Sequence, residues 1–156
     1  MKLSELLSEE VIIPDLSGNT KEEVINQLID LFKNDSRVND IEKVRIAVMD
    51  REKVMSTGVG KGFAIPHGKT DAVKDILCAF GKSKLPIDYQ SLDSQPVHLV
   101  FLLIGKDNLV SMHIKLLSRI SRMMTKDSFR DKLLFAESKD DILEIFREEE
   151  KSYFEL

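Results

Sequence analysis

The sequence lacks several features that define whole classes of protein. A single cysteine among 156 residues excludes a disulfide framework and a cysteine-based metal site. The net charge of −4 and the absence of a basic block argue against nucleic acid as a partner. No apolar run approaches the length of a membrane span, and the first ten residues are too polar for a signal peptide. These absences predict a cytoplasmic protein with no direct membrane insertion.

What remains is the composition of an ordinary globular domain. The chain is 42% hydrophobic and 32% charged, and it is long enough to bury a core without disulfides or metal. Cys78 lies in an apolar run, 76–80, with no histidine or cationic residue directly beside it. We therefore expect a buried, reduced thiol. With no internal repeat and no low-complexity segment, residues 1–156 are predicted to form one domain.

Helical and extended segments alternate along the chain. The predicted helices cover 3–9, 21–33, 41–55, 107–124, 127–136 and 139–149, and the predicted strands cover 11–13, 76–82 and 97–104. Capping residues mark three helix starts: Thr20 with Glu23, Asn39 or Asp40, and Ser138. The segment 85–93 is predicted to be a loop. This order favours a sheet covered by helices, an α/β or α+β sandwich.

The stretch 56–69, STGVGKGFAIPHGK, is the most informative part of the sequence. Three glycines at every second position precede an apolar run, a proline and a histidine: Gly58, Gly60, Gly62, Pro66 and His67. Glycines let backbone N–H groups gather into an anion-binding concavity, and the proline stiffens the entry to the histidine. We expect an accessible imidazole beside a backbone that binds phosphate or an oxyanion.

The spacing of the glycines matches neither of two known nucleotide-binding patterns. Between Gly62 and Gly68 stand five residues where a Walker A loop needs four, and Pro66 would delete a required N–H group. The earlier glycines lack the third spacing of the dinucleotide pattern. A surface loop without a ligand remains the alternative, in which Lys61 and Lys69 are solvated charges.

The other two histidines carry weaker signals. His113 falls within the apolar stripe of the helix 107–124, and a lone histidine there is more often a core residue than a functional one. His98 alternates with its apolar neighbours at a strand start, which indicates a structural or surface role. The three histidines have no metal-ligand spacing, so no metal is expected.

The run 51–70, REKVMSTGVGKGFAIPHGKT, closely resembles the signature of the enzyme IIA domains of the bacterial phosphoenolpyruvate-dependent sugar phosphotransferase system. The match is to the fructose/mannitol class, which includes the nitrogen-regulatory IIA proteins. It continues in Ile87-Asp88 and Leu92-Asp93, in PVHLVFLLI (96–104) and in HIKLLSRISRMM (113–124), and so covers nearly the whole chain. The resemblance implies an α/β (α+β) fold, in which helices flank both sides of a mixed β-sheet of about five strands in a single compact domain.

The resemblance also implies a site. In such proteins the histidine after the proline is phosphorylated, which here is His67. The second histidine of the site opens a helix and is matched by His113, and the arginine of the preceding helix is matched by Arg51. Charge on the phosphoryl oxygens is expected to meet Arg51, His113 and the backbone of a loop formed by Ser56, Thr57, Gly58, Gly60 and Gly62. Neither a metal nor a cofactor is required.

The implied function is that of a phosphocarrier. His67 would accept a phosphoryl group from phospho-HPr and pass it to a IIB domain or protein for fructose- or mannitol-type sugar uptake. The alternative is a nitrogen-regulatory IIA protein whose phosphorylation state controls its binding to other proteins, a reading that the lack of a fused IIB-like segment favours. For the docking rim around His67 the candidates are Met55, Val59 and Phe63, although core burial is the expected fate of Phe63. The sequence does not identify the sugar.

Overall fold

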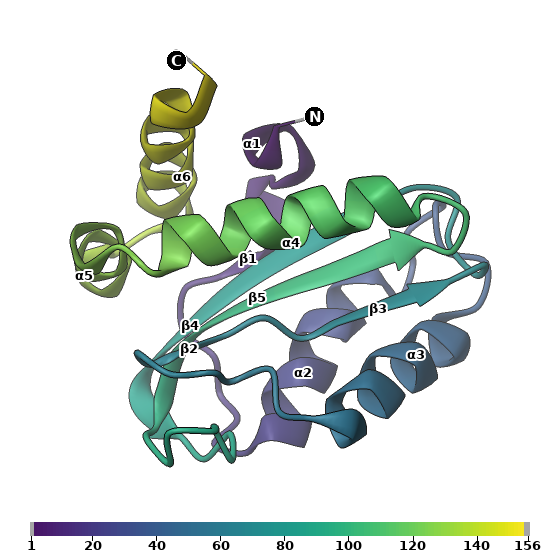
Figure 1. Cartoon of the computed structure of the whole chain (residues 1–156), viewed down its shortest axis with the longest axis horizontal. Helices are drawn as coiled ribbons and strands as arrows, with labels where there is room; N and C mark the ends of the chain where they lie inside the picture. Colours follow the sequence, from purple (N-terminus) through teal and green to yellow (C-terminus); the bar gives the residue numbers. More distant parts are fainter. Residues whose placement is uncertain (1, 155–156) are drawn as a thin grey trace.

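A mixed β-sheet separates two groups of helices (Figure 1), and the computed structural model describes residues 2–154 of the chain. The helices are α1 (Leu3–Leu6), α2 (Lys21–Ile29), α3 (Ile41–Val54), α4 (Val110–Met124), α5 (Asp127–Phe135) and α6 (Lys139–Phe154), with 3₁₀ turns η1 (Glu9–Val11) and η2 (Asp30–Phe32). The strands are β1 (Ile12–Ile13), β2 (Phe63–Ala64), β3 (His67–Thr70), β4 (Leu77–Ile87) and β5 (Val97–Lys106). The predicted fold class is confirmed.

The long antiparallel pair β4–β5 forms the centre of the sheet. β1 adds to β4 in parallel, while β2 and β3 pair one after the other with β5, also in parallel. Pro66 falls in the gap between β2 and β3, where its carbonyl oxygen still accepts the N–H of Leu103. Pairing resumes at once with His67 opposite Leu103. The proline therefore divides one edge strand in two and places His67 at the start of the second part.

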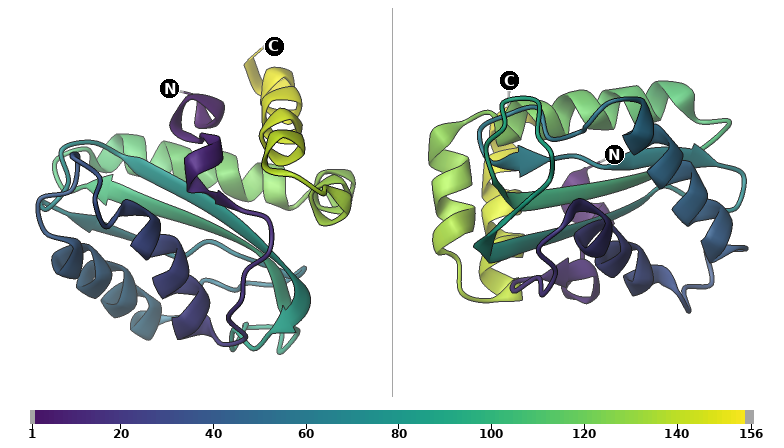
Figure 2. Two further views of the ribbon diagram at one scale, coloured as in Figure 1. Left: turned by 180° about the vertical axis from the view of Figure 1, so that it is seen from behind. Right: turned by 90° about the horizontal axis from the view of Figure 1, so that it is seen from below.

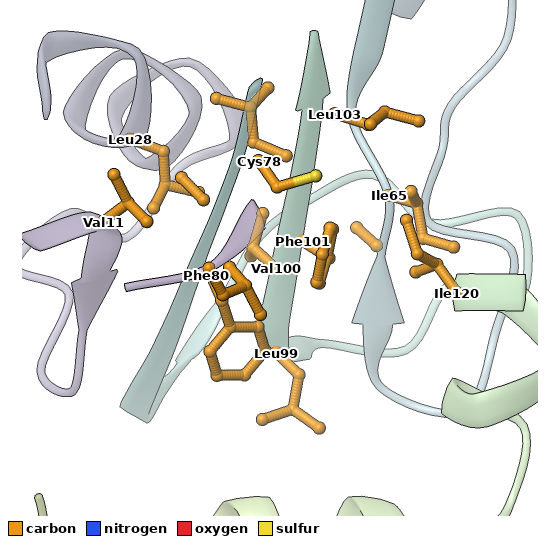
Figure 3. Close-up of a cluster of buried hydrophobic side chains, with 14 of the residues drawn as sticks. Val11, Leu28, Ile65, Cys78, Phe80, Leu99, Val100, Phe101, Leu103 and Ile120 are labelled. Atoms are coloured by element: carbon orange, nitrogen blue, oxygen red, sulfur yellow. The ribbon is translucent and has the colours of Figure 1, made fainter. Parts of the chain in front are cut away.

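The two faces of the sheet carry different helices (Figures 1 and 2). α4 crosses one face, and α2 and α3 lie against the other. On the α4 face, Phe146 of α6 packs against Phe80, Phe101 and Phe129, with ring centroids 5.2 to 5.7 Å apart. Figure 3 shows part of the buried core along β4 and β5, with Cys78 among its side chains. Cys78 is 1% exposed, and burial raises the pKa of its thiol, as expected of an unreactive core cysteine.

Most helix starts follow the predicted capping chemistry. Thr20 accepts the N–H of Glu23 and donates its hydroxyl to the Glu23 carboxylate, so the side-chain cap of the predicted capping box is present. Asp40, not Asn39, caps α3 by accepting two N–H groups of its first turn. Ser138 Oγ accepts the N–H of Asp141 at the start of α6.

Four sequence predictions need correction. Residues 85–87 belong to β4, because Ile87 is buried and pairs with Val97 after an irregularity in the strand register. The helix predicted over 3–9 is only one turn long, and α6 continues to Phe154, beyond the predicted end at 149. Met55 lies past the end of α3 and is 56% exposed, so it does not belong to the buried stripe of that helix.

Candidate functional site

His67 and His113 meet at one edge of the sheet, where β3 lies between α3 and α4 (Figure 1). His67 opens β3, and His113 lies in the first turn of α4. The centroids of their imidazole rings are 5.6 Å apart, and the ring planes are tilted by 55°. Both rings and Arg51, in the last turn of α3, line one hollow of about 320 Å³; its other lining residues are Ala47, Gly68, Lys69, Ile114 and Leu117. The structure therefore brings together the three side chains selected from the sequence.

Two glycines allow this close arrangement. A Cβ on Gly105 of β5 would overlap the His113 ring, with Nδ1 the nearest atom. A Cβ on Gly68 of β3 would stand 2.9 Å from the backbone of α3 at Ala47 and Val48. Because successive strand residues face opposite sides of a sheet, His67 points to the α4 side while Gly68 admits α3 on the other side. The sequence analysis gave neither glycine a packing role.

The tautomer of His67 follows from its hydrogen bond. Its Nδ1 lies 2.8 Å from the carbonyl oxygen of Ile65, and because a carbonyl only accepts, Nδ1 must carry the ring proton. Burial lowers the pKa of His67, the bond to Ile65 opposes that shift, and the positive charges of Arg51 and Lys69 add to it. The ring is therefore neutral at neutral pH, with a lone pair on Nε2.

His113 is held as a second neutral imidazole. It is 3% exposed, and burial, followed by the nearby His67 and Lys69, lowers its pKa to about 4. Its Nδ1 has no hydrogen-bond partner among the described residues. Unpaired buried N–H groups are rarer than unpaired acceptors, so the ring proton belongs on Nε2, which lies farther from Gly105. A neutral His113 can thus still donate an N–H group.

Arg51 and Lys69 both bring positive charge to the site. The Arg51 side chain is half-buried, and Nη1 donates to the carbonyl oxygen of Met55, just beyond α3, at 2.9 Å. This bond occupies one of the five N–H donors of the guanidinium group and holds the side chain at the end of the helix. The remaining donors can serve a ligand in the hollow.

The loop predicted to meet phosphoryl oxygens lies outside the residues that line the hollow. Thr57 N–H donates to Glu52 and Gly58 N–H donates to Ser56 Oγ, so these two amides already have acceptors. Gly60 and Gly62 adopt φ values of 141° and 78°, a backbone region that side chains disfavour, which explains the glycines at these positions. The role of Ser56, Gly60 and Gly62 toward a phosphoryl group stays a prediction.

Sequence reasoning missed a buried polar group beside the site. Glu52 is 4% exposed, and its carboxylate accepts the N–H and the hydroxyl of Thr57 and pairs with Lys21. Tyr89, which is fully buried, lies 2.8 Å from the Thr57 hydroxyl. The only sequence signal was a carboxylate directly after Arg51 in a predicted amphipathic helix.

Apolar side chains surround the hollow. Ile114, which lines it, is 57% exposed, and Val110, one turn earlier on α4, is 42% exposed. Of the residues predicted for the rim, Val59 is exposed and Phe63 is 1% exposed and belongs to the core. A partner that approaches His67 would therefore also meet the first turns of α4.

The remaining polar residues of interest have surface or structural positions. Lys61 and Lys69 are exposed, and Lys61 has a φ of 61° within the glycine loop. His98 Nδ1 lies 3.0 Å from the carbonyl oxygen of Ser83, which fits a structural role. Within residues 2–154, no group of three or more His, Cys, Asp or Glu side chains could hold a metal ion. No helix in this range combines the length and apolarity needed to cross a bilayer.

Known proteins resemble this chain over most of its length. The 38% identity to the fructose-specific EIIABC component of Bacillus subtilis extends over 151 residues, 97% of this chain but 24% of that protein. The crystal structure of nitrogen regulatory protein IIA-Ntr from Neisseria meningitidis superposes with a TM-score of 0.86 at 28% identity, covering 92% of this chain and 98% of that one. Mannitol enzyme IIA from Escherichia coli, in complex with phosphorylated mannitol enzyme IIB, gives 0.77 at 25% identity, covering 91% and 97%.

A family model assigns the chain directly. Residues 5–149 match the model for the EIIA 2 domain of the phosphoenolpyruvate-dependent sugar phosphotransferase system. The match includes β3, α3 and α4, the three elements that carry His67, Arg51 and His113. The chain belongs to the EIIA 2 family of that phosphotransferase system.

Proposed function

We propose that this chain is a phosphocarrier that accepts a phosphoryl group from phospho-HPr on Nε2 of His67 and passes it to a IIB partner. The observation that carries the proposal is the hydrogen bond from His67 Nδ1 to the Ile65 carbonyl, at 2.8 Å. It fixes the proton on Nδ1 and leaves the Nε2 lone pair available as a nucleophile. The lowered pKa of His67 keeps that lone pair unprotonated at neutral pH.

The phosphoryl transfer requires no metal ion. The P–N bond of the donor histidine breaks while a P–Nε2 bond forms, and the donor ring, protonated on its other nitrogen, leaves with the bonding electron pair as a neutral imidazole. His67 keeps its Nδ1 proton, so its ring takes over the positive charge that the donor ring loses, and the Ile65 contact persists in the phosphorylated state. Charge on the transferring oxygens is met by the Arg51 guanidinium and by the N–H of neutral His113.

The neutral state of His113 suits a relay. A protonated His113 would add a further cation to Arg51 and Lys69, bind a phosphoryl group more tightly and slow its release, whereas a neutral N–H donor stabilises the oxygens more weakly. The product is a phosphoramidate, which retains a high transfer potential, so the group can move onward to IIB. The complex of a related IIA with phosphorylated IIB supports this acceptor class.

A second candidate function is regulatory. The match to nitrogen regulatory protein IIA-Ntr, at a TM-score of 0.86, favours a protein whose phosphorylation state controls its contacts with other proteins. The same His67 chemistry serves both functions, because each requires loading by a phosphorylated donor.

Phosphotransfer from purified phospho-HPr, with His67→Ala as the control, tests the shared step. The wild-type chain should gain one acid-labile phosphate by mass spectrometry, and the variant should gain none. IIB proteins of the same organism then separate the candidates. Onward transfer to a fructose- or mannitol-type IIB selects transport, whereas loading without a IIB acceptor, combined with capture of a non-transport protein in one phosphorylation state only, selects regulation.

A further inference from the structure

A buried chain of hydrogen bonds joins α3 to the segment that leads into His67. Glu52 Oε1 accepts the N–H of Thr57 at 2.9 Å, and Glu52 Oε2 accepts the Thr57 hydroxyl at 2.6 Å. Thr57 Oγ1 lies 2.8 Å from the Tyr89 hydroxyl, and Lys21 Nζ lies 3.2 Å from Glu52 Oε1. All four side chains are more than nine-tenths buried. An ionised carboxylate in such a position persists only when it is paired and hydrogen-bonded, and Glu52 is both.

The hydrogen positions in this chain follow from the acceptors. A carboxylate can only accept, so the Thr57 hydroxyl must donate to Glu52. The Tyr89 hydroxyl must then donate to Thr57 Oγ1, and it has a proton to give, because burial and then the Glu52 charge raise the pKa of Tyr89 well above its usual value. Each hydroxyl therefore donates one hydrogen bond: Tyr89 donates to Thr57, and Thr57 donates to Glu52.

Thr57 and Glu52 each connect this chain to one of the reacting groups. The Thr57 carbonyl oxygen accepts the N–H of Ile65 at 3.2 Å, and the Ile65 carbonyl oxygen accepts the Nδ1 proton of His67 at 2.8 Å. Glu52, in turn, is the direct neighbour of Arg51 on α3. A single buried carboxylate therefore connects the helix that carries the arginine with the carbonyl that sets the histidine tautomer.

This connection spans the glycine loop. Between Thr57 and Ile65 the chain passes through Gly58, Gly60 and Gly62, which restrict the backbone less than any other residue. The pairing of β2 with β5 holds the far end of this loop in the sheet, and the bonds of Thr57 to Glu52 and to Ile65 tie its near end to α3 and to that strand.

We propose that Glu52, Thr57, Tyr89 and Lys21 form a positioning clamp that sets the place and tautomer of His67 relative to Arg51 for phosphoryl transfer. The inference rests on the proposed phosphocarrier function. None of the four residues touches the transferred group: each acts through Thr57, Ile65 and the end of α3. The clamp gives Thr57 a role different from that of an amide donor to the phosphoryl oxygens.

Thr57→Val tests the clamp, because valine keeps the shape of threonine and removes only its hydroxyl. Thr57→Ser restores the hydroxyl and serves as the rescue variant. Ile142→Val, which removes one buried methylene from α6 on the α4 face of the sheet, controls for a general loss of stability. Since a misplacement of about 1 Å can cost about 10²-fold in rate, we expect Thr57→Val to lower kcat for transfer from phospho-HPr at least tenfold. KM should stay within about twofold, because the docking surface is unchanged.

Nitrogen-15 NMR of the His67 ring provides a readout that does not depend on transfer. The wild-type, Thr57→Ser and Ile142→Val chains should show the Nδ1-protonated neutral tautomer, and Thr57→Val should show a mixture of both neutral tautomers. A Thr57→Val chain that matches Ile142→Val in kcat and in its ring spectrum overturns the clamp. A wild-type chain that takes no phosphate overturns the phosphocarrier function instead, and the ring spectra alone then decide for or against the clamp.

Discussion

Gly105→Ala should displace the ring of His113 while leaving the histidine itself unchanged. The Cβ added on β5 would overlap His113 Nδ1 and would stand 2.9 Å from Cε1 and 3.0 Å from Cγ of the same ring. Carbon atoms pack at about 3.5–4.0 Å, so the ring must move away by about 1 Å or rotate. Gly105 of β5 closes one side of the His113 ring, and the hollow that His113 shares with His67 lies on an open side. We expect the ring to move toward that hollow.

The size of the effect follows from geometry rather than from lost charge. A shift of about 1 Å in a positioned catalytic group can cost about 10²-fold in rate, so kcat for phosphoryl transfer should fall by about one to two orders of magnitude. The added methyl group should also destabilise the fold by about 1–3 kcal/mol, as is typical of overpacked core positions. His113→Ala should slow transfer to a similar extent, yet acceptance of phosphate should remain measurable.

A double-mutant cycle separates displacement of the ring from general damage. In Gly105→Ala combined with His113→Ala the small side chain on α4 leaves room for the new Cβ, so the double variant should be no slower than His113→Ala alone. Gly81→Ala provides the matched control, because its Cβ would meet Leu16, which is not among the residues that line the hollow, at 2.9 Å. It should lose stability and keep its transfer rate.

Stopped-flow measurement of phosphoryl transfer from phospho-HPr, with thermal unfolding of each variant, checks these expectations. Additive losses in the double variant would refute the reasoning, because they would mean that Gly105→Ala acts on something other than the His113 ring. Equal transfer rates for Gly105→Ala and Gly81→Ala would refute it as well.

Two further predictions concern charge. Arg51→Ala should lower the transfer rate by about 10²-fold, the usual loss when one donor to a developing charge is removed. Lys61→Ala removes an exposed positive charge from the glycine loop and should leave the rate within about twofold. Equal losses in the same transfer assay would contradict the role given to Arg51. Acid should destabilise the fold through His113: its pKa falls from an ordinary 6.5 to about 4, so the unfolded chain binds the proton first and stability is lost as pH drops from about 6.5 to about 4. Urea unfolding across this range should show a steeper loss for the wild-type chain than for His113→Ala, and parallel curves would contradict the burial of a neutral ring.

Local chemistry made much of the fold readable from the sequence. The caps at Thr20 and Asp40 place the starts of α2 and α3 correctly, because each depends on residues within one helical turn. β4 was predicted too short, since Pro86 and the polar residues near it are typical of a loop. Its last residue, Ile87, is held in the sheet by Val97, a contact across a turn that local patterns do not reveal.

Some residues of the site could be predicted from the sequence and others could not. His67 could be selected from the residues around it, and His113 and Arg51 from the family signature, because that signature spans all three. Tyr89 and Gly105 could not be selected. Tyr89 acts through the Thr57 hydroxyl, 32 positions away in the sequence, and Gly105 acts through the ring of His113 on α4. For the amide of Thr57, the pattern did not reveal that Glu52 already accepts its N–H.

The central claim is that Nε2 of His67 receives the phosphoryl group. Phosphorylating ¹⁵N-histidine-labelled protein with phospho-HPr and recording phosphorus–nitrogen couplings tests it most directly. The account predicts one phosphate, coupled to Nε2 of His67, and no labelling of His67→Ala under the same conditions. A coupling to Nδ1, a phosphate on His113, or acid-labile phosphate on the His67→Ala chain would contradict it.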